Sequence, residues 1–183
     1  MSEFTILETP RLTLRALTPE VYKNAYANWS DEEIKSFFGY ANDKTLNEEI
    51  EKYEKGICTW NRSFVNFQLL EKNSGKLIGW CGFHTWATHH FRAEMGYAMG
   101  SDEYKNKGFM KEAIRPIVEY GINEMKLHRI EALVATDNVA SIKVLTGLGF
   151  SFESILREHY CVNGVNEDSV MYVLLKHEYN FTV

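Results

Sequence analysis

The sequence predicts one domain of the α/β (α+β) class, in which a mixed, mostly antiparallel sheet of about seven strands carries helices on both faces. Three adjacent segments between residues 64 and 99 alternate apolar and polar residues, as half-buried strands do. Residues 108–125 then change to the helical period of apolar residues. A strand follows that helix, so the chain needs a crossover connection and hence a mixed sheet. A length of 183 residues suits one domain spanning 1–183.

The segment up to residue 59 predicts a strand followed by helices. The stretch RLTLRAL alternates apolar residues, which indicates a half-buried strand. Thr18 suits the N-cap of a helix and Pro19 its first position. The helical pattern continues to residue 59 and is broken near FFGYAND. The aromatic residues of SFFGY are unusual for a connecting segment, so they either wall a ligand pocket or pack in the core.

The rest of the chain supplies the sheet and two more helices. FVNFQLLE and KLIGWCGFHTW are strands joined by a turn at 73–75, and RAEMGYAM completes the meander. The helix at 108–125 contains Pro116, which costs about 3 kcal/mol or kinks the helix. RIEALVAT is the next strand, and 138–148 is a helix that we expect Gly149 to cap. Two final strands are expected to pair with each other, near 150–160 and 168–175.

Composition and charge limit the functional classes. Hydrophobic residues at 45% and charged residues at 25% are ordinary for a globular protein, and the net charge of −5 argues against nucleic-acid and anionic-membrane partners. The cysteines form no CxxC pair, which predicts neither a disulfide framework nor a zinc site: Cys58, Cys81 and Cys161. No signal-peptide pattern and no apolar run of roughly 18 residues is present. We therefore expect a cytoplasmic protein.

The stretch SDEYKNKGFMKEA is the most informative part of the sequence. Three lysines surround a helix start at Gly108, although lysine is favoured at the opposite end of a helix: Lys105, Lys107 and Lys111. The first amides of a helix lack internal acceptors, and a glycine lets a ligand approach them, so this start suits a phosphate or pyrophosphate. The alternative is a solvated loop whose lysines lie beside Asp102, Glu103 and Glu112. Neither a Walker loop nor GxGxxG is present.

Two motifs carry a family resemblance. Residues 105–110 occupy the pattern Q/R-x-x-G-x-G/A at a helix start. A second pattern, which runs from N-x-x-S/A to G-F, is occupied by Asn138, Ser141, Gly149 and Phe150. With these motifs the chain resembles the Gcn5-related N-acetyltransferases (GNAT). The resemblance tightens toward the branch that acetylates ribosomal-protein N-termini, through TPRLTLRALTPE, AEMGY and NGVNEDSVMYVLL, and so covers nearly the whole chain.

The resemblance implies how acetyl-CoA binds. Its pyrophosphate lies on the amides of residues 107–111, and its pantetheine arm adds like a strand at residues 97–99, where the fourth and fifth strands splay apart. Lys105 replaces the usual Gln or Arg, and Met110 replaces the usual Gly or Ala. Met110 is compatible with the site if its side chain points into the core, since amides hold the phosphates. The implied cofactor-binding residues are Tyr97, Ala98, Met99, Lys105, Asn106, Lys107, Gly108, Phe109, Met110, Lys111, Asn138 and Ser141.

The same resemblance implies direct transfer of the acetyl group to a primary amine in a ternary complex. Glu94, on the strand that lines the family's cleft, is the candidate base, and the alternative is a solvated carboxylate paired with Arg92. Ser141 is the candidate for hydrogen bonding to the departing thiolate, or else a small packing residue. Asn138 contacts the cofactor, caps a helix, or does both. Leu145 stands where the family usually has the tyrosine that protonates the thiolate, so another group or water supplies that proton.

The acceptor and partners are expectations of the same kind. The branch resemblance favours a peptide N-terminal amine, with a polyamine or antibiotic amine as the alternative acceptor. A non-catalytic acyl-CoA-binding module is the alternative function, and a nucleotide-binding protein is disfavoured because no residue is placed for Mg²⁺. A monomer or a homodimer is expected, with no metal.

Several histidines and one tyrosine are further candidates for the site. The sequence predicts a solvated turn rather than a metal site at His84, His89 and His90, because neighbouring side chains on a strand point apart. His84 is nevertheless a candidate neighbour of the acceptor. His159 and Tyr160, on the strand after the second motif, are candidates for lining the cleft.

Overall fold

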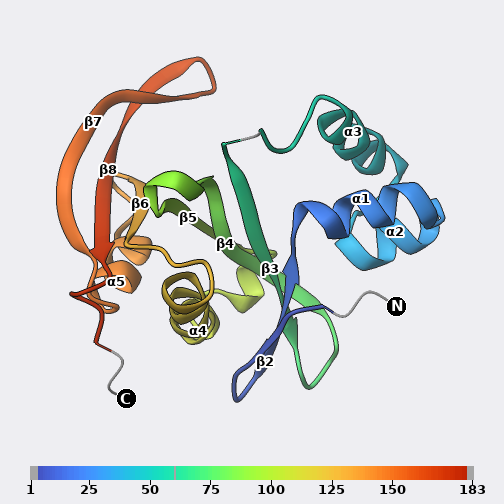
Figure 1. Cartoon of the computed structure of the whole chain (residues 1–183), viewed down its shortest axis with the longest axis horizontal. Helices are drawn as coiled ribbons and strands as arrows, with labels where there is room; N and C mark the ends of the chain where they lie inside the picture. Colours follow the sequence, from blue (N-terminus) through green and yellow to red (C-terminus); the bar gives the residue numbers. More distant parts are fainter. Residues whose placement is uncertain (1–3, 60, 181–183) are drawn as a thin grey trace.

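The fold is built around one sheet with helices on both sides (Figure 1). The computed structural model describes residues 4–59 and 61–180. In those ranges the sheet has eight strands in the order β1-β2-β3-β4-β5-β6-β8-β7, against about seven predicted. The elements are β1 (Ile6–Glu8), β2 (Leu12–Leu17), α1 (Pro19–Asn28), α2 (Asp31–Phe38), α3 (Asp43–Glu54), β3 (Ser63–Glu71), β4 (Leu77–Ala87), β5 (Arg92–Met99), α4 (Phe109–Asn123), β6 (Arg129–Ala135), α5 (Val139–Thr146), β7 (Ser151–Val162) and β8 (Val165–Leu175), with 3-10 turns at Thr88–His90 and Asp102–Tyr104.

The strand pairing confirms the predicted mixed, mostly antiparallel sheet. Every neighbouring pair is antiparallel except β5 and β6, which are parallel and are joined by the crossover helix α4. The meander β3-β4-β5 forms as expected, and β8 lies between β6 and β7. The final two strands pair with each other across a turn in which Asn163 and Gly164 both have positive φ. In the described ranges, none of the helices has the length and apolar character needed to cross a membrane.

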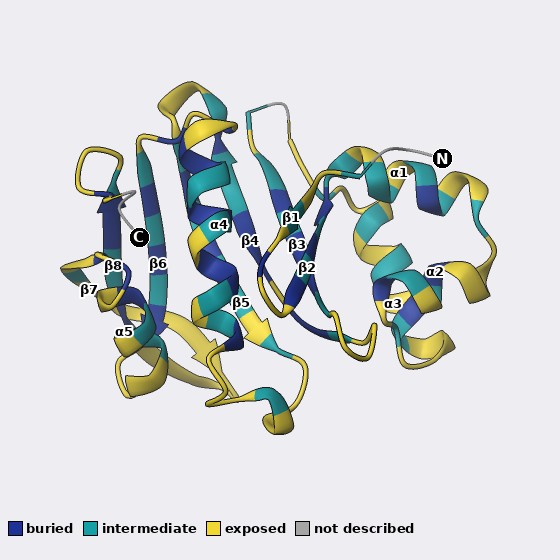
Figure 2. Ribbon diagram, turned by 90° about the horizontal axis from the view of Figure 1, so that it is seen from below, coloured by how far each residue is buried: buried dark blue, intermediate teal, exposed yellow. Residues whose placement is uncertain are grey.

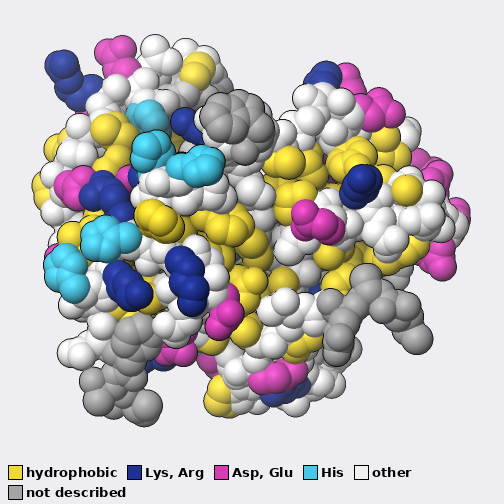
Figure 3. Space-filling view, viewed as in Figure 1, with side chains coloured by type: hydrophobic (Ala, Val, Ile, Leu, Met, Phe, Trp, Pro, Cys, Tyr) yellow, Lys and Arg dark blue, Asp and Glu magenta, His cyan; other side chains and the backbone are white. Residues whose placement is uncertain are grey.

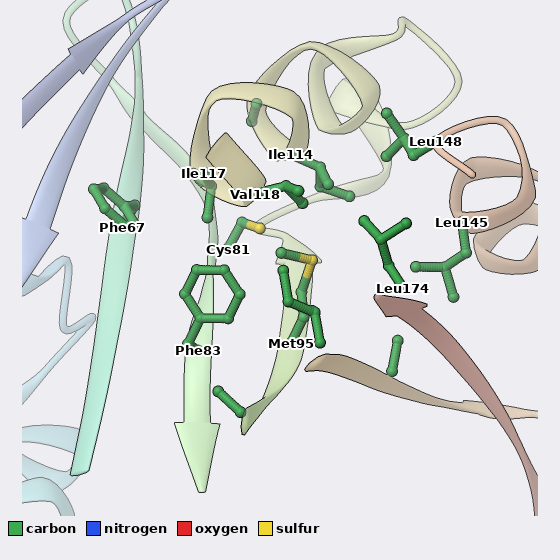
Figure 4. Close-up of a cluster of buried hydrophobic side chains, with 14 of the residues drawn as sticks. Phe67, Cys81, Phe83, Met95, Ile114, Ile117, Val118, Leu145, Leu148 and Leu174 are labelled. Atoms are coloured by element: carbon green, nitrogen blue, oxygen red, sulfur yellow. The ribbon is translucent and has the colours of Figure 1, made fainter. Parts of the chain in front are cut away.

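One face of the sheet packs against α4. The helix buries Ile114, Ile117 and Val118 against alternate residues of the central strands, including Phe83 and Met95 (Figure 4). Figure 2 shows α4 lying across the sheet with buried and exposed residues alternating along it. This amphipathic pattern is the one that the helical period predicted.

Helix α4 contains one proline and one glycine, and the glycine shows how closely the helix packs on the sheet. Pro116 lies inside the helix without ending it. Gly121 has no side chain where a Cβ would stand 2.6 Å from Cζ of Phe83, so the ring of Phe83 occupies that space.

The opposite face of the sheet carries α1–α3 at the β2–β3 end. A second hydrophobic cluster joins Leu17 of β2 to residues of all three helices: Ala25, Ile34, Phe38 and Leu46. Gln68 of β3 and Arg15 of β2 both donate hydrogen bonds to the backbone carbonyl of Phe37, at 2.7 and 3.2 Å. Because these side chains alternate with the residues that face α4, the helices lie on both faces, as predicted.

Several element boundaries differ from the expectation. The helical region before residue 59 is broken twice, because Ser30 begins α2 with a capping box in addition to the break near Gly39. Helix α5 ends at Thr146, two residues earlier than expected, and Gly147 follows in a right-handed conformation. Gly149 has a φ of +90° and donates a backbone hydrogen bond to Thr146, while Phe150 donates one to Leu145. These are the bonds of a Schellman motif, so the prediction that Gly149 caps α5 is confirmed.

Candidate active site

The pairing between β5 and β6 stops partway along the two strands. It covers three residue pairs and ends where Glu94 lies beside Glu131. Beyond that point β5 pairs only with β4, while β6 pairs only with β8. The predicted splay between the fourth and fifth strands is therefore confirmed, and we call the opening bounded by residues 95–99 and 132–135 the wedge. On the wedge side, the alternate backbone polar groups of 95–99 have no strand partner in the described part of the chain.

The helix start that follows β5 presents free amides. Gly108, the N-cap of α4, has a φ of +80° and gives no side-chain cap, and Asn106 also has positive φ. No acceptor among the described residues takes the N–H groups of Phe109, Met110 and Lys111. The side chains of Phe109 and Met110 pack against the core, which meets the condition set for Met110 by the sequence. This turn therefore has the donors that a phosphate needs.

The charges around this turn are arranged differently from the expectation. Lys105 forms an ion pair with Asp102 at 2.6 Å, as in the solvated-loop alternative, whereas Lys107 and Lys111 are exposed. Glu112 takes no lysine as its partner but lies against Arg11 from the turn between β1 and β2.

Arg11 is a residue of this region that the sequence reasoning missed. Its guanidinium donates to Glu112 Oε2 at 2.7 Å and to the carbonyl of Lys107 at 3.0 Å, and it lies 4.3 Å above the ring of Phe109. Burial alone would raise the pKa of Glu112, but hydrogen bonds from Thr9 and Arg11 hold it below its usual value. Arg11 thus ties the N-terminal strands to the helix start. Its presence in the TPRL motif was the available signal, but the motif gave it no role.

Helix α5 closes the wedge from the same side of the sheet as α4. Asn138 caps the helix by accepting the N–H of Ser141 at 3.1 Å, so its capping role is established. The hydroxyl of Tyr97, on β5, donates to the carbonyl of Ser141 at 3.5 Å and so spans the wedge. Leu145 is fully buried in the core. The hydroxyl of Tyr97 and the backbone of Ser141 therefore meet here.

Glu94 lies on the other face of β5, at the point where the β5–β6 pairing ends. Its side chain is 18% exposed, and its carboxylate stands 3.7 Å from Nε2 of His84. Arg92 pairs with Glu131 at 3.0 Å rather than with Glu94, so the expected pairing of Arg92 with Glu94 is wrong. Arg129 also pairs with Glu131, at 2.7 Å. Of the two adjacent carboxylates, only Glu94 lacks an arginine or lysine partner among the described residues.

A glycine in β5 and a bulge in the β7–β8 hairpin determine which side chains lie near Glu94. A Cβ on Gly96 would stand 3.0 Å from Nε2 of His84, so the glycine leaves room for His84 to lie across β5. In the curved β7–β8 hairpin, Asp168 accepts the N–H of Glu158 at 2.8 Å within a bulge that follows Leu156. Beyond the bulge lies Tyr160, whose pKa is raised by burial and by the negative charge of Glu94.

A groove runs between α1–α3 and the face of β3 and β4 that carries His84. It consists of two adjoining pockets of about 900 and 460 Å³, which share Tyr22, Glu49 and Asn66 as lining residues. Figure 3 shows hydrophobic side chains gathered in the hollow between the two halves of the molecule. Phe38 and Tyr40 line the larger pocket, so the SFFGY aromatics both wall a pocket and pack in the core.

The charged residues that line the groove include two carboxylates, Glu49 and Glu103. Glu49 forms an ion pair with Lys52, and the other cations that line the groove are Arg62 and Lys76. Oδ1 of Asn66 is buried and has no hydrogen-bond partner within the described ranges. Burial raises the pKa of the Tyr22 hydroxyl, which therefore stays neutral.

The remaining candidate residues from the sequence are the histidines. His89 and His90 lie in the 3-10 turn between β4 and β5, while His84 lines the smaller pocket. Oγ of Ser169 and Nδ1 of His159 share a hydrogen bond of 2.8 Å, and Ser169 is fully buried. The described residues include no group of three or more His, Cys, Asp and Glu side chains that suits a metal ion. All three cysteines are free thiols.

These features define a class of protein. A parallel strand pair that diverges beside a helix start with free amides, in a mixed sheet, is the arrangement expected of the acetyltransferases that the sequence resembles. A family profile described as "Acetyltransferase (GNAT) domain" matches residues 11–151. The chain belongs to the GNAT acetyltransferase family, and the recognition made from its motifs is confirmed.

Known proteins of this kind resemble the chain over most of its length. The uncharacterized N-acetyltransferase YoaA of Bacillus subtilis is 33% identical over 174 residues, which are 94% of this chain and 98% of that relative. A variant of the spermidine N-acetyltransferase SpeG from Vibrio cholerae superposes with a TM-score of 0.68 and 25% identity, covering 92% and 96% of the two chains. The ribosomal-protein-S5-alanine acetyltransferase from Vibrio fischeri shares the fold, with a TM-score of 0.67, 20% identity and 96% and 99% coverage.

Proposed function

We propose that this protein transfers the acetyl group of acetyl-CoA directly to a primary amine in a ternary complex, and that the acceptor is a peptide N-terminal amine. The observation that carries the proposal is the position of Glu94. Its carboxylate has no arginine or lysine partner within residues 4–59 and 61–180, it lies where the wedge opens, and His84 connects it to the groove. A carboxylate in that position suits a general base for an incoming amine. The compartment in which we expect the reaction is the cytoplasm.

The wedge and the helix start fit acetyl-CoA, which supplies the activated acetyl group. The unpartnered backbone groups of Tyr97, Ala98 and Met99 suit the amides of the pantetheine arm. The amides from Lys107 to Lys111 suit the pyrophosphate, with the ammonium groups of Lys107 and Lys111 free to approach it. Asn138 holds the first turn of α5 beside the wedge rather than contacting the cofactor through its Oδ1.

The residues near Glu94 support its role as the base. Removal of a proton from the amine is favoured by a carboxylate whose charge is not already neutralised, and Glu131 shows the contrast because two arginines bind it. His84 lies 3.7 Å away and can relay the proton to the groove. Gly96 keeps the space that this arrangement needs.

The groove favours an extended acceptor over a polycation. Two adjoining pockets of about 900 and 460 Å³ exceed what a small amine fills, and Asn66 offers an unused carbonyl oxygen. Of the groove's two carboxylates, Glu49 is already paired with Lys52 and Glu103 lines the larger pocket. Arg62 and Lys76 add positive charge, so a polyamine would meet little net attraction. The spermidine acetyltransferases among similar structures keep a small polyamine as the second candidate acceptor.

An acceptor panel with two matched variants tests this proposal. We expect release of free thiol from acetyl-CoA with short peptides that carry a free N-terminus, and at least tenfold lower kcat/KM with spermidine. The Glu94→Gln protein should lose about 100-fold in kcat at neutral pH with unchanged acetyl-CoA affinity by calorimetry. The control Glu153→Gln removes an exposed carboxylate that pairs with Arg129 and should retain full activity.

The outcomes separate the alternatives. Acetyl-CoA binding without transfer to any amine would show a non-catalytic binding module. Preference for spermidine would replace the peptide acceptor, and an active Glu94→Gln protein would move the base to another group.

A further inference from the structure

Helix α5 has no tyrosine that can protonate the departing thiolate. Leu145, at the position where the family usually has that tyrosine, is fully buried in the core. Asn138 has its Oδ1 engaged as the helix cap. The thiolate that leaves the thioester belongs to a thiol with an ordinary pKa of about 8.5, so a proton donor at the sulfur assists its departure. A protein donor on another element that borders the wedge is the alternative to water.

We infer that the hydroxyl of Tyr97 is this donor, an inference that rests on the proposed function. Tyr97 lies on the part of β5 that borders the wedge, and its hydroxyl already spans the wedge to the carbonyl of Ser141. At 3.5 Å that hydrogen bond is at the long limit for an O–H donor, so exchanging it for a sulfur acceptor costs little. The carbonyl of Ser141 thereby holds the hydroxyl in place before the reaction.

The pleat of β5 places the donor and the base on opposite sides of the reacting bond. Successive residues of a strand point to opposite faces, so Glu94 faces the groove while Tyr97 faces α4 and α5. Their Cα atoms are separated by three residues, about 10 Å along the strand. A thioester lying in the wedge between them has the amine on the side of Glu94 and its sulfur on the side of Tyr97. The two roles are thus divided between the two faces of one strand.

These two side chains account for every proton that moves in the reaction. The amine nitrogen forms a bond to the acetyl carbonyl carbon, the carbon–sulfur bond breaks, and its electron pair stays on sulfur. Glu94 takes the proton of the amine, and Tyr97 gives its phenolic proton to the sulfur. Transfer of the proton from Glu94 to the Tyr97 oxygen through solvent restores both groups. Burial raises the pKa of Tyr97, so the hydroxyl is protonated at neutral pH before each turnover.

Other hydroxyls near the site fit the role less well. Tyr160 lies on the side of Glu94, whose charge raises its pKa, and so on the side of the amine. Ser141 borders the wedge, but the proton of a serine hydroxyl is held too tightly to be given to a thiolate. Ser141 suits a supporting hydrogen bond, as the sequence suggested.

The Tyr97→Phe protein, with wild type and two control proteins, tests the inference. We expect kcat to fall about 100-fold while the acetyl-CoA Kd from calorimetry changes less than twofold. Ser141→Ala should lower kcat less than tenfold. Tyr120→Phe removes a half-buried hydroxyl from α4, away from the wedge, and should leave kcat unchanged.

The results distinguish failure of the inference from failure of the proposed function. Full kcat in Tyr97→Phe beside an active wild type would overturn the role of Tyr97 alone. A loss of acetyl-CoA affinity equal to the loss of kcat/KM would also overturn it, because the hydroxyl would then only bind the substrate. A wild type that transfers no acetyl group to any amine would overturn both the function and the donor.

Discussion

A negative charge at Gly108 should compete directly with the phosphates of acetyl-CoA. Asp and Asn are matched replacements, since both have nearly the same shape and tolerate a positive φ better than other side chains. A Cβ at this position meets only Nη2 of Arg11, at 3.5 Å, which is ordinary contact. The φ of +80° costs both variants the same strain, about 1 kcal/mol. The difference between Gly108→Asp and Gly108→Asn therefore isolates the charge.

The size of the effect follows from Coulomb's law. One charge about 5 Å from a phosphate, at an effective dielectric constant of about 20, costs about 3 kcal/mol, or roughly 100-fold in Kd. Attraction to Arg11 reduces this, so we expect the Asp variant to bind acetyl-CoA between about 10-fold and 100-fold more weakly than the Asn variant. Calorimetry at low and high salt measures the difference, which should shrink with salt. Equal affinities at low salt would refute the placement of phosphates at this helix start.

The remaining predictions concern the residues that support the helix start and the core. Arg11→Ala should raise the acetyl-CoA Kd about tenfold, which corresponds to the loss of one charge-assisted hydrogen bond. Replacement of the exposed Arg115 by Ala should leave the Kd unchanged. Equal Kd values for the two variants would show that Arg11 does not contribute to acetyl-CoA binding. Glu112→Gln should lower the free energy of unfolding by about 1–2 kcal/mol at pH 7. Because the folded-state pKa of Glu112 is lowered, its contribution to stability is complete above the unfolded pKa of about 4.3 and is lost as pH falls through the folded value. Urea unfolding should therefore show a smaller stability difference between wild type and Glu112→Gln at pH 3 than at pH 7. Gly121→Ala should destabilise the protein by about 1–2 kcal/mol, since its Cβ would stand 2.6 Å from Cζ of Phe83; a raised Tm would contradict this packing argument.

Local patterns in the sequence were enough for most of the fold. The alternation of RLTLRAL, the helical period after Gly108 and the pairing of the final two strands depend on near neighbours in the chain, and each was confirmed. The errors fall where local signals are weak. Strand β1 has only three residues, which are too few to show an alternating pattern.

The helix start at Gly108 shows what a motif can predict and what it omits. Its amides were expected to be free because every helix start has free amides, and this is what the described residues show. The sequence left open whether the lysines serve a phosphate or lie beside nearby acidic residues, and Lys105 is paired with Asp102. Arg11 reaches the same turn from a distant part of the chain, which no local spacing reveals.

The sequence by itself determined the order of elements, the family, and the backbone segment that can hold a phosphate, because those depend on residue type and spacing. Tertiary structure alone decided which side chains are free to act there. Glu94 and Glu131 are the same residue type on adjacent strands, and only the register shows that arginines bind Glu131 and leave Glu94 without such a partner. Tyr97 likewise meets Ser141 only because β5 and β6 diverge and α5 closes the wedge. Such contacts join residues far apart in the chain, so their physical cause is packing rather than local sequence.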